Sequence, residues 1–226
     1  MTNNPKGPNI LELVFEECNG EAIAFQKNLI LSYEKKKKLS TLIEKIDNDD
    51  FETTKEKGDA LETLTRETLK MLMLFDALPN LHTSTNEIDF LCKLSKSGNI
   101  ALSKGYINFH KEFLIECKNY NEKVDVTYVG KFAALLINHG MKFGIMVSKE
   151  GITGANTKWS YAYGWTKKLY LKCNVLIISL TLDDFRLMLE KSFFEIIEEK
   201  KLDIINDTDI NSYLSKHPAM DNSPSE

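Results

Sequence analysis

The sequence predicts an α/β fold, in which a mixed sheet is flanked by helices and follows an N-terminal helical extension. Two segments that alternate apolar and polar residues, 87–94 and 112–118, indicate strands with one buried face. Two almost continuously apolar segments, 143–148 and 174–180, are typical of strands buried on both faces of a partly parallel sheet. The chain has 226 residues, of which 42% are hydrophobic, so it can bury a sizeable core.

Composition excludes several classes of protein. A charged fraction of 27% and a net charge of −4 are ordinary for a globular protein and exclude collagen-like, disulfide-scaffold and wholly disordered chains. No apolar run approaches the roughly 20 residues that cross a bilayer, and no basic segment followed by a long apolar run opens the chain. We therefore expect a cytoplasmic protein with no membrane partner. The pI of about 5.7 argues against coating nucleic acid by bulk charge but leaves room for a local basic groove.

The cysteines form neither a zinc-binding nor a disulfide pattern. No two of them have the C-x-x-C spacing, so we interpret them as reduced and mostly buried thiols. They are Cys18, Cys92, Cys117 and Cys173.

Helical spacing dominates the first third of the chain. The segment from Ile10 to about Ile46 predicts a helical extension that carries an apolar stripe near its end. The basic run Lys35–Lys38 is interpreted as a solvated helix face, with a phosphate-facing patch as the alternative. A further helix is predicted from Thr53 to Leu78, because leucines recur at helical spacing and a proline follows at once.

The two alternating strands each present one apolar face. In the first strand, the residues predicted to share that face are Ile88, Phe90, Cys92 and Leu94. Gly98-Asn99 and Gly105 supply turn signals before the second strand. There, Phe113, Ile115 and Cys117 share one face, and Leu114, Glu116 and Lys118 share the other.

The rest of the chain alternates helices and strands. Helices are predicted at 126–139, 156–168 and 182–201, around the two apolar strands. The predicted organisation is an N-terminal helical extension at 1–50, a main domain at 51–205 and a polar tail at 206–226.

Three charged residues interrupt the two alternating strands. Asp89 projects from the first strand, and Glu116 and Lys118 project together from the second, so the three converge if these strands are neighbours. Mg²⁺ is typically held in proteins by one or two carboxylates together with waters and phosphate. Lys118 could then polarise a water and offset charge on a phosphorus transition state, while Glu62 adds an outer carboxylate. An isolated E-x-K is also typical of a surface salt-bridging pair. Only the combination of Glu62, Asp89 and the Glu116-x-Lys118 motif in this order favours a metal site.

At these residues the sequence resembles the PD-(D/E)XK nuclease superfamily, and within it the Mrr-like restriction endonuclease branch. The resemblance begins in segments 57–62, 86–90 and 115–120, continues through 129–132 and 144–153, and covers roughly residues 55–190. The order of the motifs is more specific than any one of them. One departure is that Asn86-Glu87-Ile88 stands before Asp89, where Mrr-like relatives commonly have small residues.

The resemblance implies a restriction-endonuclease-like fold and Mg²⁺-dependent hydrolysis of DNA phosphodiesters, with Mn²⁺ as the expected substitute. By family role, Asp89 and Glu116 would ligate the metal, with the main-chain carbonyl of Cys117 as a candidate further ligand. Lys118 would orient the attacking water, and Glu62 would be the helix acid.

Two further residues are candidates for substrate binding. Lys131 falls where relatives often place a Gln or Lys facing the site, so it is expected to contact phosphate. Tyr120 belongs to an aromatic region flanked by lysines that could stack on bases. A packed helix face explains much of that region equally well.

The sequence therefore predicts a metal-dependent endonuclease acting on double-stranded DNA in restriction or defence. A homodimer is expected, with the N-terminal helices as a candidate pairing surface. Two alternatives stay open: a branched-DNA or repair nuclease of the same fold, and a non-catalytic module that binds DNA or a protein partner.

Overall fold

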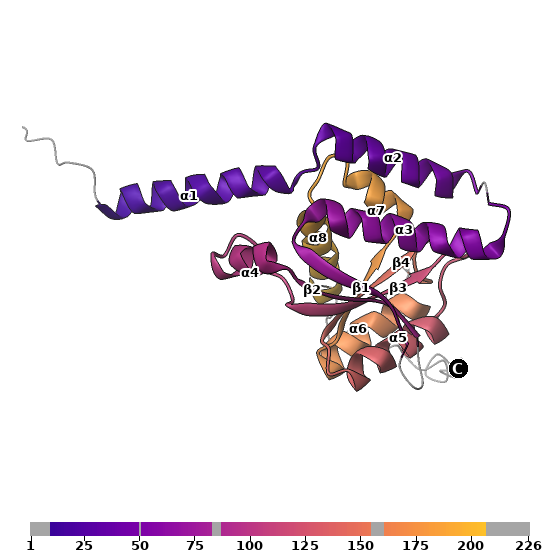
Figure 1. Ribbon diagram of the computed structural model, residues 1–226. Coiled ribbons are helices and arrows are strands. Elements are labelled where there is room, and N and C mark those ends of the chain that lie inside the picture. Colours follow the sequence, from indigo (N-terminus) through magenta and orange to yellow (C-terminus); the bar gives the residue numbers. More distant parts are fainter. Residues whose placement is uncertain (1–9, 50, 83–86, 155–160, 207–226) are drawn as a thin grey trace, which may run out of the picture.

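A single five-stranded mixed sheet forms the centre of the molecule (Figure 1). The computed structural model describes residues 10–49, 51–82, 87–154 and 161–206. The strands lie in the order β1-β2-β3-β4-β5, with β1–β2 and β2–β3 antiparallel and β3–β4 and β4–β5 parallel. They are β1 Phe75–His82, β2 Glu87–Leu94, β3 Glu112–Lys118, β4 Phe143–Ser148 and β5 Leu176–Leu180. The predicted α/β class, with a mixed sheet flanked by helices, is confirmed.

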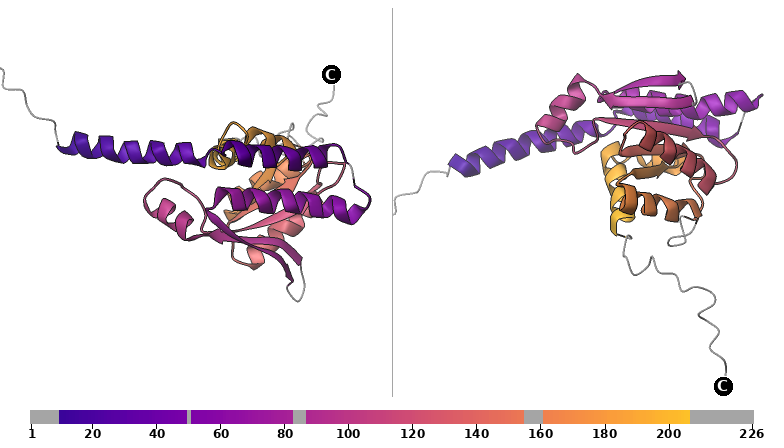
Figure 2. Two further views of the ribbon diagram at one scale, coloured as in Figure 1. Left: turned by 45° about the horizontal axis from the view of Figure 1, so that its top comes forward. Right: turned by 90° about the horizontal axis from the view of Figure 1, so that it is seen from below.

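Helices cover both faces of this sheet. One face packs against α3, α7 and α8, with α2 packed on α3 and α7, and the other face packs against α5 and α6. Helices α1 and α4 lie at one end of the sheet (Figures 1 and 2). The helices are α1 Ile10–Leu29, α2 Tyr33–Asp47, α3 Thr54–Leu72, α4 Lys96–Ser103, α5 Val126–Asn138, α6 Tyr161–Cys173, α7 Leu182–Leu187 and α8 Phe193–Asn206. None of the helices in these described ranges is both long and apolar enough to span a membrane.

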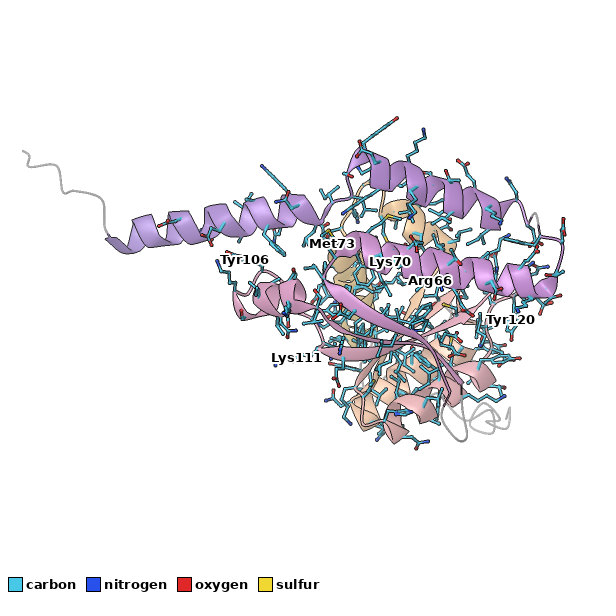
Figure 3. All side chains as sticks on the ribbon, in the orientation of Figure 1. Arg66, Lys70, Met73, Tyr106, Lys111 and Tyr120 are labelled. Carbon is cyan, nitrogen blue, oxygen red and sulfur yellow. The ribbon has the colours of Figure 1, made fainter. Side chains whose placement is uncertain are left out.

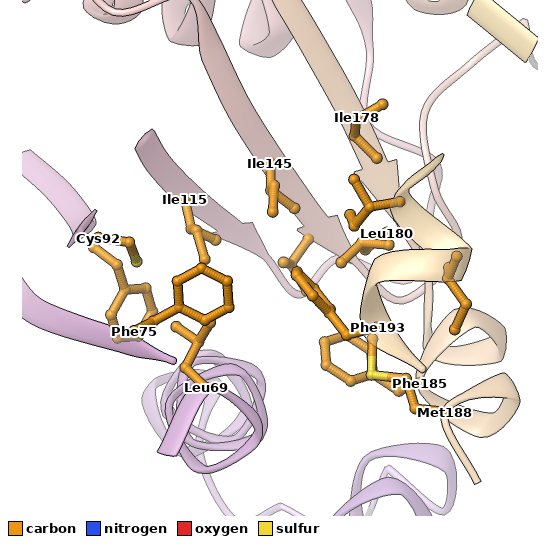
Figure 4. Packing of buried hydrophobic residues seen from close by; sticks show 14 of the residues in the cluster. Leu69, Phe75, Cys92, Ile115, Ile145, Ile178, Leu180, Phe185, Met188 and Phe193 are labelled. Atoms are coloured by element: carbon orange, nitrogen blue, oxygen red, sulfur yellow. The ribbon is translucent and has the colours of Figure 1, made fainter. Parts of the chain in front are cut away.

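Alternation along the strands divides the apolar residues into two cores. On the α3 side, Ile115, Ile145 and Ile178 from three neighbouring strands face Leu69 of α3 and Phe185 of α7 (Figure 4). The other core lies beneath α5 and α6, and β3 contributes to it through Leu114. The two faces predicted for segment 112–118 are confirmed.

The first alternating strand follows its predicted pattern with one exception. Phe90, Cys92 and Leu94 lie in the α3-side core, but Ile88 lies in the core beneath α5 and α6. Ile88 precedes the first residue of β2 that pairs with β3, so the β2–β3 ladder does not fix its orientation there.

The helix predicted from Thr53 to Leu78 is too long, because α3 ends at Leu72 and β1 begins at Phe75. Met73 adopts the left-handed conformation, with φ of 60°, and its N–H donates to the Lys70 carbonyl, which closes the helix. Pro79, which was expected to stop the helix, instead lies in β1, where an edge strand tolerates the missing N–H.

Gly98-Asn99 is not a turn but part of α4, which is capped by Ser95 accepting from the Gly98 N–H at 3.2 Å. A Cβ at Gly98 would lie 2.2 Å from the Leu74 carbonyl oxygen, so close packing, not chain reversal, requires a glycine here.

Other predicted boundaries shift as well. The N-terminal helical segment breaks between Leu29 and Tyr33, and the closing helix breaks between Leu187 and Phe193. The last predicted strand begins at 176 rather than 174. The first residues of the helix predicted at 156–168 lie outside the described residues, as does the tail from 207 onward, and α6 runs on to Cys173.

Two lysines of the basic run Lys35–Lys38 join α2 to α3. Lys35 Nζ donates to the Met71 carbonyl at 2.6 Å, and Lys38 Nζ pairs with Glu67 Oε2 at 2.6 Å. Lys35 and Lys38 therefore bind the C-terminal part of α3. A cation is stabilised there by the negative end of the helix dipole. Leu39 and Ile43 of α2 lie in the same hydrophobic core as residues of α3 and the sheet.

The domain boundary expected at residue 50 stays a prediction.

Glu67 is expected to stabilise the fold in a pH-dependent way. Hydrogen bonds from Lys38 and Lys70 lower the pKa of Glu67 to about 2. A carboxylate with a lowered native pKa contributes stability above its unfolded pKa, and this stability is lost as the pH falls toward the native value. Because both lysines are exposed, we expect Glu67→Gln to reduce the free energy of unfolding by only about 1 kcal/mol at pH 7.

Denaturant unfolding of the wild type and Glu67→Gln between pH 7 and pH 2 measures this difference. It should shrink from about pH 4.5 downward and vanish near pH 2. Glu44→Gln, which changes an exposed carboxylate of α2 with no ion pair in the described structure, is the control and should show no such trend. A constant deficit across this range would contradict the assignment.

Candidate functional site

Strands β2 and β3 part at the residues that carry the candidate acids. Their antiparallel pairing ends with Phe90 opposite Ile115. Extended by two residues, this register would place Ile88 opposite Cys117. Instead, the Asp89 carboxylate accepts a hydrogen bond from the Cys117 main-chain N–H, with Oδ2 2.6 Å from N. The Asp89 side chain thus takes the place of a main-chain partner and reaches across the opening to β3.

The other two candidate groups project from β3 beside this contact. Glu116 and Lys118 are joined by an ion pair, with Nζ 2.5 Å from Oε1, which places both on the sheet face opposite the Cys117 side chain. Their side chains are 14% and 22% exposed, and Asp89 is 9% exposed. Asp89 touches the residue that follows Glu116, so two acids and an amine meet where the strands separate. The sequence predicts this convergence, and the structure places the three residues on neighbouring strands, with the charge of Asp89 acting on Lys118.

Charge and burial act in opposite directions on Lys118. Burial of the ammonium acts to lower the pKa of Lys118, but the charge and hydrogen bond of Glu116 and the charge of Asp89 outweigh it and raise the pKa. Lys118 therefore carries a positive charge at neutral pH. In this state it can donate hydrogen bonds to a water or a phosphate oxygen but cannot take up a proton.

Helix α3 covers the other side of this part of β3. Thr65 Oγ1 donates to the Leu61 carbonyl at 2.9 Å and lies 3.6 Å from the Cys117 sulfur. Burial raises the pKa of the Cys117 thiol well above its usual value, and the charges of Asp89 and Glu62 raise it further. The thiol is therefore protonated, which leaves the main-chain carbonyl as the ligand predicted at this position.

Glu62 lies one turn before Thr65 on α3. Its charge reaches the Cys117 thiol, which places it on the side of the helix that faces β3. This position agrees with an outer carboxylate rather than a member of the central group.

The donor set suits a hard divalent cation. Asp89, Glu116 and the Cys117 carbonyl offer oxygen atoms, the ligands that Mg²⁺ prefers, and Oε2 of Glu116 is buried. Within the described ranges, no group of three or more His, Cys, Asp or Glu side chains is arranged to hold a metal ion. A cation here would therefore rest on two carboxylates and main-chain oxygen, with the remaining positions left for water and substrate, as is usual for Mg²⁺.

An open groove of about 580 Å³ lies beyond the end of β3. Tyr120 lines it and is 42% exposed, and its ring centroid lies 5.5 Å from that of Tyr128 on α5. Lys131 Nζ lies 5.4 Å from the centroid of the Tyr128 ring. The two predicted substrate-binding residues are thus linked through Tyr128. Tyr120 lies at the end of the molecule where α3 begins (Figure 3).

Side chains that sequence reasoning missed fix the loop after β3. Asn119 donates to the Lys57 carbonyl, and Lys57 Nζ donates to Asn121 Oδ1 at 2.5 Å and pairs with Asp49 at 2.6 Å. These bonds tie the start of α3 to the groove. In the sequence, Lys57 is the first residue of segment 57–62, where the resemblance to the nuclease superfamily begins. The sequence gives no indication that Lys57 pairs with Asp49 and Asn121.

No family model matches the chain, and no curated protein matches it. Among solved structures, the chain resembles the DNA modification-dependent restriction endonuclease AspBHI at 15% sequence identity and a TM-score of 0.38. The likeness covers 81% of this chain and 42% of that one, so the chain spans less than half the length of AspBHI.

The roles assigned to Glu62, Asp89, Glu116, Lys118, Lys131 and Tyr120 stay predictions, as does membership of the Mrr-like branch. They rest on the order of the motifs and on the meeting of the three charged groups at one opening of the sheet.

Proposed function

We propose that this protein is a Mg²⁺-dependent endonuclease with a PD-(D/E)XK core of the Mrr-like branch, which cuts double-stranded DNA in restriction or defence. The observation that carries the proposal is the contact of the Asp89 carboxylate with β3 beside the Glu116–Lys118 ion pair. Two acids and a charged amine, all largely buried, meet at an opening of the sheet beside a groove.

Each group has a distinct task in this reaction. Asp89, Glu116 and the Cys117 carbonyl would hold Mg²⁺, which when bound lowers the pKa of water and offsets negative charge on a phosphate. The Lys118 ammonium would orient the attacking water and stabilise the charge that develops on the phosphorus oxygens. Water would attack the phosphorus in line with the ester P–O bond that breaks, so the phosphorus inverts and no covalent enzyme intermediate forms. The departing sugar oxygen takes up a proton from solvent, and the attacking water loses one to solvent. Glu62 would act from the outer layer, and Lys131 and Tyr120 would contact the DNA.

A branched-DNA or repair nuclease would use the same groups on a differently shaped substrate. A non-catalytic binding module is less favourable physically, because burying two carboxylates beside each other without a metal ion is costly, even with Lys118 paired to one of them. Neither alternative has an observation of its own in its favour.

Incubation of the full chain with plasmid, four-way-junction and single-stranded DNA, in Mg²⁺ or in EDTA, tests the proposal. We expect plasmid cleavage that requires Mg²⁺ or Mn²⁺. Preference for the junction would move the assignment to a branched-DNA nuclease. Salt-dependent DNA binding without cutting in any divalent ion would support the binding module instead.

We propose further that the protein pairs with a second copy of itself through α1. Apolar residues recur along α1 at alternating spacings of four and three, the repeat of a coiled coil, at positions 11, 15, 18, 22, 25 and 29. Positions 25 and 29 pack against the body of the same chain, so positions 11, 15, 18 and 22 form the seam proposed for the second copy. The C-terminal part of this helix contacts the rest of the molecule. The ring centroids of Phe25 and Tyr106 are 5.0 Å apart, and Lys104 Nζ lies 3.4 Å from Glu21 Oε2. The remainder extends past the body in every view (Figure 2).

Sedimentation of the full chain over a range of concentrations measures this pairing. We expect a dimer that Phe15→Glu weakens at least about tenfold, because a charge at a seam position must be desolvated on pairing. Glu17→Lys changes an exposed position outside the repeat and should leave the dimer intact. A wild-type monomer at all concentrations would rule the pairing out.

A further inference from the structure

Ser148, the last residue of β4, carries a buried hydroxyl beside Lys118. The parallel register of β3 and β4 places Ser148 opposite Lys118. Ser148 is 1% exposed, and its Oγ makes no hydrogen bond within the described part of the chain. A buried hydroxyl without a partner is unfavourable and needs a physical reason, since alanine would fill such a position without that loss.

The two side chains lie on the same sheet face. Val147 belongs to the α3-side core and Met146 to the core beneath α5 and α6, so alternation directs Ser148 away from α3. Lys118 shares this orientation, because it pairs with Glu116 on the face opposite the Cys117 side chain. Adjacent strands are about 4.8 Å apart, which is within the reach of a lysine side chain.

A divalent cation at the proposed site would compete with Lys118 for Glu116. The ammonium now lies 2.5 Å from Oε1 of that carboxylate. Once the carboxylate ligates a cation, repulsion between the two positive charges displaces the ammonium, and its N–H groups need another acceptor. The Ser148 hydroxyl is such an acceptor on the adjoining strand.

We propose that Ser148 is a positioning residue. When a divalent cation is bound by Asp89 and Glu116, the Ser148 Oγ accepts a hydrogen bond from Lys118 Nζ. This hydrogen bond holds the amine next to the cation. This inference rests on the proposed function, since it requires the cation at Glu116.

Calorimetric titration of the full chain with Mn²⁺ tests the role of Ser148 directly. We expect Ser148→Ala to weaken Mn²⁺ binding about tenfold, the loss of one hydrogen bond to a charged group, and Ser148→Thr to bind within about twofold of the wild type. The matched control is Ser179→Ala. Ser179 lies on the same face one strand further on, opposite Met146, and its buried Oγ also makes no hydrogen bond among the described residues. Its loss should leave Mn²⁺ binding unchanged.

A second pair of variants links the effect to the amine. In the Lys118→Met background no ammonium has to be accommodated, so adding Ser148→Ala should change Mn²⁺ affinity less than about twofold. Wild-type affinity in Ser148→Ala, or an equal loss in the Lys118→Met background, would overturn the role of Ser148 and leave the nuclease proposal standing. A wild type that neither binds Mn²⁺ nor cuts DNA would instead overturn the proposed function, and this inference with it.

Discussion

Replacement of Lys118 by methionine is expected to slow DNA cleavage by about a hundredfold to a thousandfold while the protein stays folded. Methionine keeps the length and apolar stem of the lysine but removes the charge that acts on the developing phosphorus oxygens, and loss of one such preformed donor has an effect of this size. Asp89→Ala should reduce cleavage at least as much, because it removes a cation ligand and also the acceptor of the Cys117 N–H.

Single-turnover cleavage of plasmid, with thermal unfolding of each variant, measures the effect of Lys118→Met. Lys93→Ala is the matched control, because Lys93 is an exposed lysine of β2 that pairs in register with Glu112, at the other end of the β2–β3 ladder. It should cut at the wild-type rate. Cleavage by Lys118→Met at that same rate would remove the amine from the mechanism.

Truncation of Phe113 to alanine is expected to cause the largest loss of stability, about 3–5 kcal/mol in the free energy of unfolding. Phe113 is fully buried on β3. Its ring centroid lies 5.4 Å from that of Phe75, 5.3 Å from that of Phe109 and 5.7 Å from that of Phe143. Removing the ring would leave a cavity at the meeting point of three aromatic side chains that come from different parts of the chain.

Denaturant unfolding compares this variant with two others. Phe113→Leu keeps most of the volume and should cost markedly less than alanine. Tyr33→Ala removes an aromatic ring that is 78% exposed, so its effect should stay within about 0.5 kcal/mol. Equal losses for Phe113→Ala and Tyr33→Ala would mean that β3 is not held by this aromatic cluster.

The strands that carry the candidate site could be predicted from the sequence because their burial follows the two-residue period. Segment 112–118 has one apolar face and one face with Glu116 and Lys118, and both faces lie where alternation places them. The two hydrophobic strands were equally clear, since strands buried on both faces need no alternation.

Elements decided by tertiary contacts were missed. The residues of β1 have leucine spacing that suits a helix, and only the pairing with β2 and the left-handed Met73 make them a strand. Glycine followed by asparagine is typical of a turn, but Gly98 lies in α4. A glycine is needed there because the helix packs closely against the Leu74 carbonyl.

The site itself divides in the same way. The meeting of Asp89, Glu116 and Lys118 follows from strand order and spacing. The hydrogen bond from the Cys117 N–H to Asp89 could not be foreseen, because it depends on β2 and β3 parting at that point. The same holds for the buried Ser148 hydroxyl, which only the register of β4 against β3 brings next to Lys118.

Anomalous diffraction from crystals of the full chain grown with Mn²⁺ is the most direct test of the central claim, that the acids of β2 and β3 together hold a divalent cation. The account predicts one strong peak with Asp89 and Glu116 oxygens both about 2 Å away. A peak elsewhere, or none while the Glu116–Lys118 ion pair persists, would contradict it.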